Sequence, residues 1–220
     1  MNPNYSKLLD KELEKLSQNS EKPTLLLHSC CAPCSSYVLE YLREYFRITV
    51  FYYNPNITDG KEYEYRLNEE KRLIGAYNRQ VREHDFEGMN STEQAMLIDI
   101  MEAPYDPGNY LSAVKGYEDC PEGGDRCGIC FEMRLRESAK AAADNGFDFF
   151  TTTLTISPLK NAARLNEIGE RLSGEYGVRF LPSDFKKKNG YKRSIELSKE
   201  FSLYRQNYCG CAFSRREAGS

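Results

Sequence analysis

Seven of the eight cysteines in this 220-residue chain fall into three short clusters whose spacing suits metal or redox chemistry. The first lies in LLLHSCCAPCSS, directly after an apolar run and before a segment with helical spacing. The second is a CxxC pair in DRCGICFEMRL, and the third is a CxC pair in NYCGCAFS. Thiolates bind zinc and iron–sulfur clusters and also exchange electrons as dithiols. The clustered residues are Cys30, Cys31, Cys34, Cys127, Cys130, Cys209 and Cys211.

The redox environment of the protein determines whether these thiols favour disulfides or metal and redox chemistry. The first 23 residues lack the basic and then apolar run of a signal peptide, and no apolar stretch approaches a membrane span. We therefore expect a cytoplasmic protein without a membrane partner. In a reducing compartment the cysteines favour metal binding or redox chemistry over structural disulfides. Two histidines are too few for a His-rich zinc site, and the net charge of −3 argues against a globally basic nucleic-acid binder.

Spacing within the clusters separates the metal hypotheses only in part. A CxxC pair at a helix start places both sulfurs on one face, where unpaired backbone N–H groups favour thiolates. Adjacent Cys30 and Cys31 make a poor zinc knuckle, because neighbouring side chains on an extended backbone diverge. The pattern therefore favours an iron–sulfur cluster over structural zinc, with buried metal-free thiols as a third interpretation. The CxC pair suits a strained disulfide, a second metal or ordinary buried thiols.

Hydrophobic periodicity predicts the elements that position these clusters. Strands at 24–28 and 47–54 flank a helix, and helices then alternate with further strands, which predicts a doubly wound parallel α/β sheet with helices on both faces. Ligands of such folds bind at the carboxyl ends of the strands. The further helices are expected at 61–79, 128–145, 161–175 and 191–203, and the further strands at 80–84, 147–154 and 178–182. The domain prediction is a polar extension (1–23) whose short helix lies outside the main fold, one catalytic domain (24–214) with a helical and loop insertion (88–124), and a tail (215–220).

Several long motifs in fixed order resemble one family, the cobalamin-independent epoxyqueuosine reductases (QueH). They include LLHSCCAPCSSYVLEYL, EGGDRCGICFEMRL, LPSDFKKKNGYKRSIELSKEF and LYRQNYCGCAFS, and the resemblance covers about residues 25 to 214. It implies a Rossmann-like fold of the adenine-nucleotide α-hydrolase (HUP) type, a [4Fe-4S] cluster and no cobalamin. It also implies reduction of the epoxide of epoxyqueuosine in tRNA to queuosine, the last step of queuosine biosynthesis, with electrons from an unidentified low-potential donor.

The same resemblance assigns roles to the cysteines. Cys30, Cys31, Cys127 and Cys130 look like the cluster ligands. Cys209 and Cys211 look like a redox-active pair or, together with Cys34, like the ligands of an additional mononuclear iron. Cys120 matches no motif and is expected to be incidental. These assignments are implied by the resemblance alone.

For contact with tRNA, the basic stretch DFKKKNGYKRS is the strongest candidate, because phosphate contacts need clustered positive charge. Tyrosines beside it could stack unpaired anticodon bases. A lysine run is, however, often only a solvated surface. The candidates are Lys186, Lys187, Lys188, Tyr191, Lys192, Arg193, Tyr204 and Arg205.

Further polar residues follow predicted strands. Thr155, Ser157 and Lys160 could hydrogen-bond a diol, although Ser157 before Pro158 also suits a helix cap. His28 is expected to be a hydrogen-bonded core residue rather than a proton donor, and Asn54 a turn former.

Two other function classes stay open from the residues. An ATP-dependent tRNA-modifying enzyme of similar fold would need a glycine-rich phosphate loop where SCCAPCS stands. A zinc-binding module without catalysis would bind metal but carry no colour.

Overall fold

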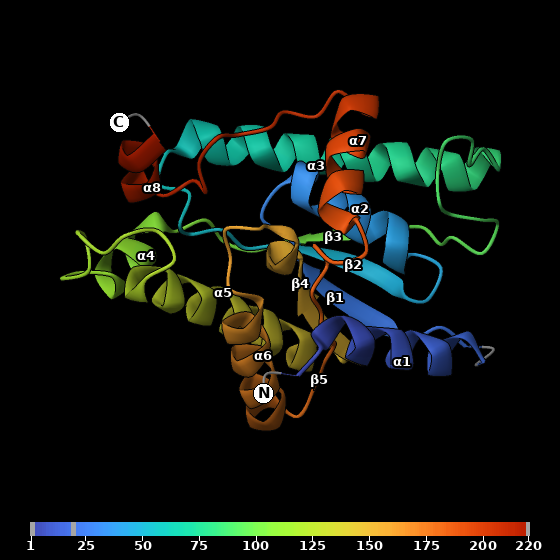
Figure 1. The fold of residues 1–220 in the computed structure, drawn as a ribbon, viewed down its shortest axis with the longest axis horizontal. Coiled ribbons are helices and arrows are strands. Elements are labelled where there is room, and N and C mark those ends of the chain that lie inside the picture. The colour runs from blue at the N-terminus through green and yellow to red at the C-terminus, as the bar shows by residue number, and fades with distance from the viewer. Residues whose placement is uncertain (1–2, 19–20, 219–220) are drawn as a thin grey trace.

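A computed structural model describes residues 3–18 and 21–218, and within these ranges five strands form one parallel sheet with helices on both faces (Figure 1). The strand order is β3-β2-β1-β4-β5. The elements are α1 (Tyr5–Ser17), β1 (Thr24–His28), α2 (Ala32–Leu42), β2 (Arg47–Tyr52), α3 (Gly60–Glu83), β3 (Asp99–Glu102), α4 (Pro107–Ala113), α5 (Asp125–Asp144), β4 (Phe149–Thr152), η1 (Thr153–Ile156), α6 (Ala162–Tyr176), β5 (Arg179–Phe180), α7 (Gly190–Glu200) and α8 (Ala212–Ala218).

The central strand β1 pairs in parallel with β2 on one side and with β4 on the other. Strand order therefore reverses between β1 and β4, which is the topological switch point where doubly wound sheets bind ligands. The predicted α/β fold class is confirmed. The first cysteine cluster leaves the sheet at this switch point, because it directly follows β1.

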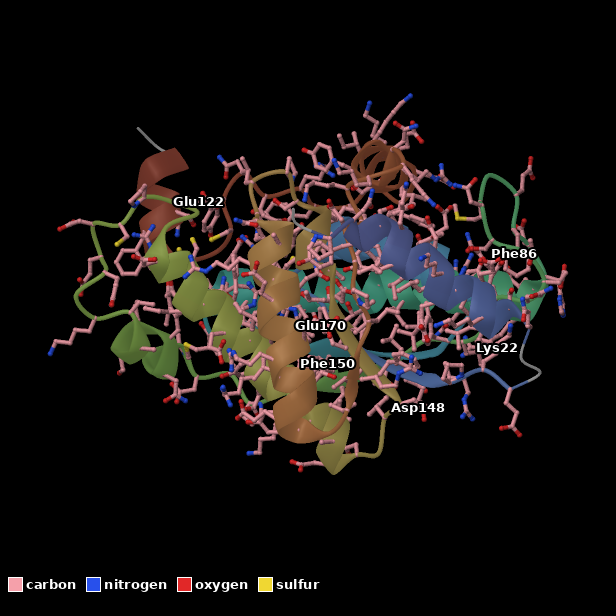
Figure 2. The ribbon with its side chains drawn as sticks, turned by 60° about the horizontal axis from the view of Figure 1, so that its bottom comes forward. Lys22, Phe86, Glu122, Asp148, Phe150 and Glu170 are labelled. Carbon is pink, nitrogen blue, oxygen red and sulfur yellow. The ribbon has the colours of Figure 1, made fainter. Side chains whose placement is uncertain are left out.

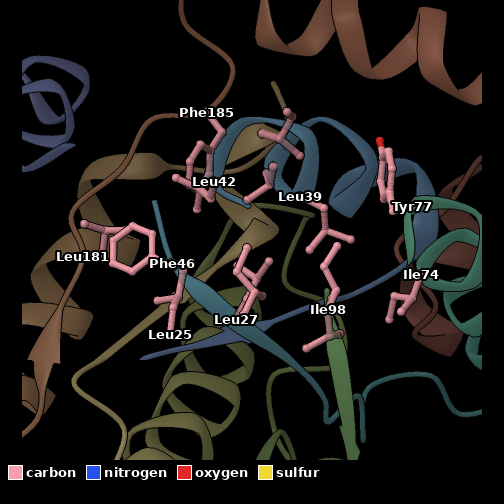
Figure 3. Packing of buried hydrophobic residues seen from close by; sticks show 14 of the residues in the cluster. Leu25, Leu27, Leu39, Leu42, Phe46, Ile74, Tyr77, Ile98, Leu181 and Phe185 are labelled. Atoms are coloured by element: carbon pink, nitrogen blue, oxygen red, sulfur yellow. The ribbon is translucent and has the colours of Figure 1, made fainter. Parts of the chain in front are cut away.

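The apolar run of β1 reflects burial on both faces of the sheet. Leu25 and Leu27 pack with Leu39 and Leu42 of α2 on one face (Figure 3). Leu26 points to the opposite face and packs with residues of α5 and α6. All three leucines of β1 are fully buried, which fixes the strand's position and hence that of the loop after it.

The third strand lies elsewhere than predicted. Helix α3 continues to Glu83, so the strand expected at 80–84 is wrong. Buried Leu73, Ile74 and Tyr77 maintain the helical period, and His84 ends the helix in the left-handed conformation. The third strand is instead β3, inside the segment predicted as an insertion. It is an edge strand without fully buried residues, so it lacks the apolar run from which a strand is predicted.

The N-terminal helix forms as predicted but does not lie outside the fold. Leu9, Leu13 and Leu16 of α1 are buried in the main core. Part of the predicted tail is helical in α8, whereas residues 1–2, 19–20 and 219–220 lie outside the described residues. Across the described ranges, no helix combines the length and apolar character needed to cross a membrane.

Two glycines of α6 give a matched test of its packing. A Cβ at Gly169 would overlap the ring of Phe180, whereas a Cβ at Gly174 would meet open space. We expect Gly169→Ala to lower the free energy of unfolding by about 1–3 kcal/mol through overpacking. Gly174→Ala should raise it by up to about 1 kcal/mol, because alanine favours the helix. Urea unfolding of both variants measures this, and equal effects would contradict the packing of α6 on β5.

Candidate metal centre

The first three cysteines lie where β1 gives way to α2. Cys30 lies in a bend, Cys31 is the N-cap residue of α2, and Cys34 is in the helix's first turn. Their sulfurs all lie within 4.8 Å of one another, and those of Cys30 and Cys31 are 3.7 Å apart. The expectation that these two neighbouring side chains diverge is therefore wrong, because the backbone bends at Cys30 and does not continue as an extended strand. We call Cys30, Cys31 and Cys34 the cysteine trio.

The trio shares its charge unequally. Hydrogen bonds from Cys31 and Cys34 hold the pKa of the Cys30 thiol well below its usual range, and Arg134 and Lys160 act in the same direction. The bond to Cys30 raises the pKa of Cys31 to about 12, and the pKa of Cys34 is also raised. The trio therefore favours the charged form at Cys30 and the neutral form at Cys31 and Cys34. Three soft sulfur donors this close together fit a metal ion or one edge of a cluster.

The other two clusters meet at a second cavity. Cys127 and Cys130 come from the first turns of α5, and Cys209 and Cys211 directly precede α8. All four line a cavity of about 20 Å³. The sulfurs of Cys209 and Cys211 lie 3.6 Å apart without a disulfide between them, and the hydrogen bond from Cys209 lowers the pKa of Cys211 to about 6. In Figure 2, Glu122 lies beside sulfur atoms, in agreement with its place in the lining of the same cavity.

One cysteine joins the two groups. Cys209 lines the small cavity and also a larger pocket of about 300 Å³ whose lining includes Cys30 and Cys34. The structure therefore brings all seven clustered cysteines to one region, at the carboxyl edge of the sheet. The predicted cluster ligands comprise two members of the trio and two residues of the small cavity. Cys120 lines neither cavity.

A buried arginine lies between the trio and the small cavity. Arg134 of α5 is 2% exposed and lines both cavities. Its Nε donates to His28 Nε2 at 3.2 Å, and its Nη2 donates to Asn54 Oδ1 at 2.6 Å. Asn54 in turn donates to the carbonyl of Ser29 at 2.9 Å. Arg134 is not among the site residues predicted from the sequence, although its position one helical turn after Cys130 is an available signal.

Both ring nitrogens of His28 have hydrogen-bond partners. Nδ1 lies 2.8 Å from Thr152 Oγ1, and Nε2 lies 3.2 Å from Arg134 Nε, which can only donate, and 3.1 Å from the Tyr53 carbonyl, which can only accept. Burial and Arg134 lower the pKa of His28 to about 3. His28 is therefore a neutral core residue, as predicted. Asn54 does more than form a turn, because its side chain links Arg134 to the loop after β1.

A carboxyl group lies buried near the trio. Among the described residues, no hydrogen bond of ordinary geometry reaches either side-chain oxygen of Glu70 in α3, and the side chain is fully buried. Burial raises the pKa of Glu70 to about 7, although the hydroxyls of Ser35 and Ser29 act in the opposite direction. No sequence pattern indicates that Glu70 is buried, because a glutamate in a charged helix is ordinarily exposed.

Helix α3 holds the CxC segment in place through hydrogen bonds to its backbone. Arg66, whose side chain is 1% exposed, donates to the carbonyls of Cys209 and Tyr208 and pairs with Glu62. Asn56 also donates to the carbonyl of Cys209. Ser214 contacts both sulfurs of the pair. The segment is thereby fixed beside the larger pocket, whose lining includes Arg66, Tyr208 and Cys209.

We expect Arg66→Gln to displace the CxC segment and to lower both stability and turnover. Losing charged hydrogen bonds to two carbonyls should reduce the free energy of unfolding by about 2 kcal/mol or more. A shift of the pair by about 1 Å is enough to slow turnover by roughly a hundredfold. Arg72→Gln is the matched control, because Arg72 binds the carbonyls of Phe201 and Ser202 from the same helix but is largely exposed. Equal turnover in the two variants would contradict this role.

The larger pocket receives some of the predicted RNA-binding residues. Tyr191 and Arg205 line it. Tyr204 instead bonds to Glu62 through its hydroxyl group. Most of the basic run is engaged in ion pairs: Lys186 with Asp184, Lys188 with Asp10, Lys192 with Glu196, and Arg193 with Glu40.

The loop after β4 contributes two of its three predicted residues. Ser157 and Lys160 line the larger pocket, and Lys160 lines the small cavity as well. Thr155 is buried and bonds to Ser183, so it does not face the pocket. Ser157 follows η1, and Asn161 is the residue that caps α6. The alternative cap interpretation of Ser157 is therefore wrong for α6.

Comparison with known proteins adds an independent finding. A family model described as epoxyqueuosine reductase QueH matches residues 25–217. Curated relatives named epoxyqueuosine reductase QueH are similar to the chain along most of its length. The protein of Streptococcus pyogenes serotype M1 is 39% identical, covering 100% of this chain and 82% of the relative. That of Staphylococcus aureus strain Mu50 is 42% identical over 98% and 85%, and that of Thermotoga maritima is 36% identical over 88% and 91%.

Proposed function

The chain belongs to the epoxyqueuosine reductase QueH family, and from that premise we propose that it reduces the epoxide of epoxyqueuosine in tRNA to give queuosine. The observation that carries the proposal is the convergence of seven cysteines at the switch point of the sheet, next to a pocket of about 300 Å³. A pocket of that size suits a modified nucleobase with its attached ring.

The proposed cofactor is a [4Fe-4S] cluster held by Cys30, Cys31, Cys127 and Cys130, without cobalamin. Cys34, Cys209 and Cys211 are proposed as a redox-active group or as ligands of an additional mononuclear iron. The donor set supports this assignment, because thiolates are the usual ligands of iron–sulfur clusters. When bound, such a cluster supplies electrons one at a time, and an iron with an open position acts as a Lewis acid.

Reduction of the epoxide to an alkene takes two electrons and two protons, breaks both C–O bonds and releases water. The chain supplies positive charge where oxygen must leave. Lys160 lines both cavities, and Arg205 lines the substrate side. Burial alone would lower the pKa of Lys160. The sulfurs of Cys30 and Cys209 stabilise the charged form of Lys160 and raise its pKa. We assign to Lys160 a hydrogen bond to the substrate oxygen.

The partner is proposed to be the anticodon region of tRNA that carries epoxyqueuosine. Tyr191, which is 37% exposed, and Arg205 stand at the pocket and can stack on and neutralise single-stranded RNA. Lys186, Lys187, Lys188, Lys192, Arg193 and Tyr204 are proposed as outer contacts. A tRNA substrate also supports a cytoplasmic location, and the family match supports residues 24–214 as the catalytic domain.

The test is anaerobic purification followed by turnover. We expect brown protein with about four cluster irons and matching sulfide per chain. Reduced protein incubated with tRNA carrying the epoxide should yield a nucleoside lighter by one oxygen atom, as mass analysis of the released nucleosides would show. Cys120→Ala should behave as the wild type, because Cys120 lines neither cavity. Colourless protein with stoichiometric zinc and no turnover would favour a zinc-binding module instead.

A further inference from the structure

The sulfur site contains a permanent positive charge without a carboxylate partner. Arg134 is buried, and its side-chain hydrogen bonds to His28 and Asn54 both go to neutral acceptors. Among the described residues, no carboxylate forms a salt bridge with it. The two carboxyl groups close to the site, Glu70 and Glu122, are not among the charges that act most strongly on it.

Such burial is costly unless an anion compensates it. An unpaired charge in the interior strongly destabilises a protein, so buried arginines are normally paired. The groups that most strongly stabilise the charge of Arg134 against the effect of burial are sulfurs, namely those of Cys130, Cys30 and Cys209. These come from all three cysteine clusters. The arginine's natural counter-anion is therefore the thiolate site itself.

The orientation of the guanidinium is fixed from behind. Neutral His28 and Asn54 each take one N–H donor, and the hydrogen bond from Asn54 to the Ser29 carbonyl ties this arrangement to the loop that carries Cys30. A further side-chain hydrogen bond joins Arg134 to the Cys130 sulfur, and Arg134 lines both cavities. Positive charge and hydrogen-bond donors near cluster sulfurs are two of the means by which proteins raise a cluster's reduction potential.

We propose that Arg134 is the built-in counter-cation of the sulfur site and makes the reduced state of the metal centre easier to reach. This inference rests on the proposed function, because it needs a redox-active centre at the site. Arg134 is a positioning residue in this role, since it acts through the thiolates and not on the substrate. Reduction adds a negative charge, and a fixed cation stabilises the more negative state.

The experiment is a redox titration of the iron-loaded protein, followed by visible absorption and electron paramagnetic resonance. Arg134→Gln removes the charge and should shift the midpoint potential to a more negative value. Asn54→Asp leaves Arg134 in place but puts a carboxylate where Oδ1 now lies 2.6 Å from Nη2, and should shift the potential in the same direction. Because this variant gives the arginine a partner, it provides the test even if Arg134→Gln fails to fold.

Two variants should keep the wild-type potential more closely. Arg134→Lys retains the charge, and Arg136→Gln removes an arginine from the exposed side of the same helix, where it pairs with Glu132 and Glu175. If the iron-loaded Asn54→Asp and Arg134→Gln proteins both have the wild-type midpoint potential, the proposed role of Arg134 is overturned and the proposed function is not. A wild-type protein that assembles no iron–sulfur centre would instead overturn the proposed function on which the inference rests.

Discussion

Alanine at any one of Cys30, Cys31, Cys127 or Cys130 is expected to abolish cluster assembly and, with it, reductase turnover. Each thiolate is proposed to hold one iron corner, and an iron without its ligand is open to solvent and easily lost. The loss of turnover should exceed the roughly 100-fold effect typical of removing an outer-shell partner. Iron and sulfide content, visible absorption and nucleoside analysis measure the outcome.

Cys120→Ala is the control for these four variants, because it removes a thiol from the same chain without touching either cavity. Far-ultraviolet circular dichroism and the unfolding midpoint show whether each variant is folded. A folded Cys127→Ala or Cys130→Ala protein with a full complement of iron would remove α5 from the proposed ligand set.

The double variant Cys209→Ala/Cys211→Ala is expected to keep the colour of the cluster but to lose turnover by at least about a hundredfold. Cys209 lines both the small cavity and the substrate side, so the pair stands where electrons or a second iron would meet the substrate. Its sulfurs, 3.6 Å apart, are close enough to share a metal or to form a disulfide after a small movement.

Two other outcomes would change the assignment. Full activity in the double variant would refute any redox or metal role for the pair. Loss of colour would show that Cys127, Cys130, Cys209 and Cys211, which line one cavity together, hold the cluster among themselves. In that case the cysteine trio would be left to bind the additional iron. The same measurements as for the single variants separate these cases.

The electrostatics of the site explain why its arginines matter. Arg134 compensates sulfur charge from within α5, and Arg66 fixes the CxC backbone from α3. Both are almost completely buried. Replacing Arg134 should therefore change the midpoint potential of the metal centre, whereas replacing Arg66 should change the free energy of unfolding and the turnover rate.

The fold was predictable where burial leaves a mark on the sequence. The leucines of β1 form an uninterrupted apolar run because both faces of that strand are covered, and α2 and α5 follow their hydrophobic period. Strand β3 left no such mark, because an edge strand with half-exposed residues needs no apolar run. The polar composition of residues 1–23 predicts a helix outside the main fold, yet three buried leucines on one face of α1 are enough to join it to the core.

What the sequence alone determined is the chemistry available: which thiols exist, that two clusters begin helices, and which family the motifs resemble. Only the tertiary structure decided which sulfurs are neighbours. Residues 30, 130 and 209 are far apart in the chain, and strand pairing and helix packing bring them to the same two adjoining cavities. It also revealed Arg134, Arg66 and Glu70. A charged residue looks the same in the sequence whether it is solvated or buried, because its environment is created by distant segments that fold around it.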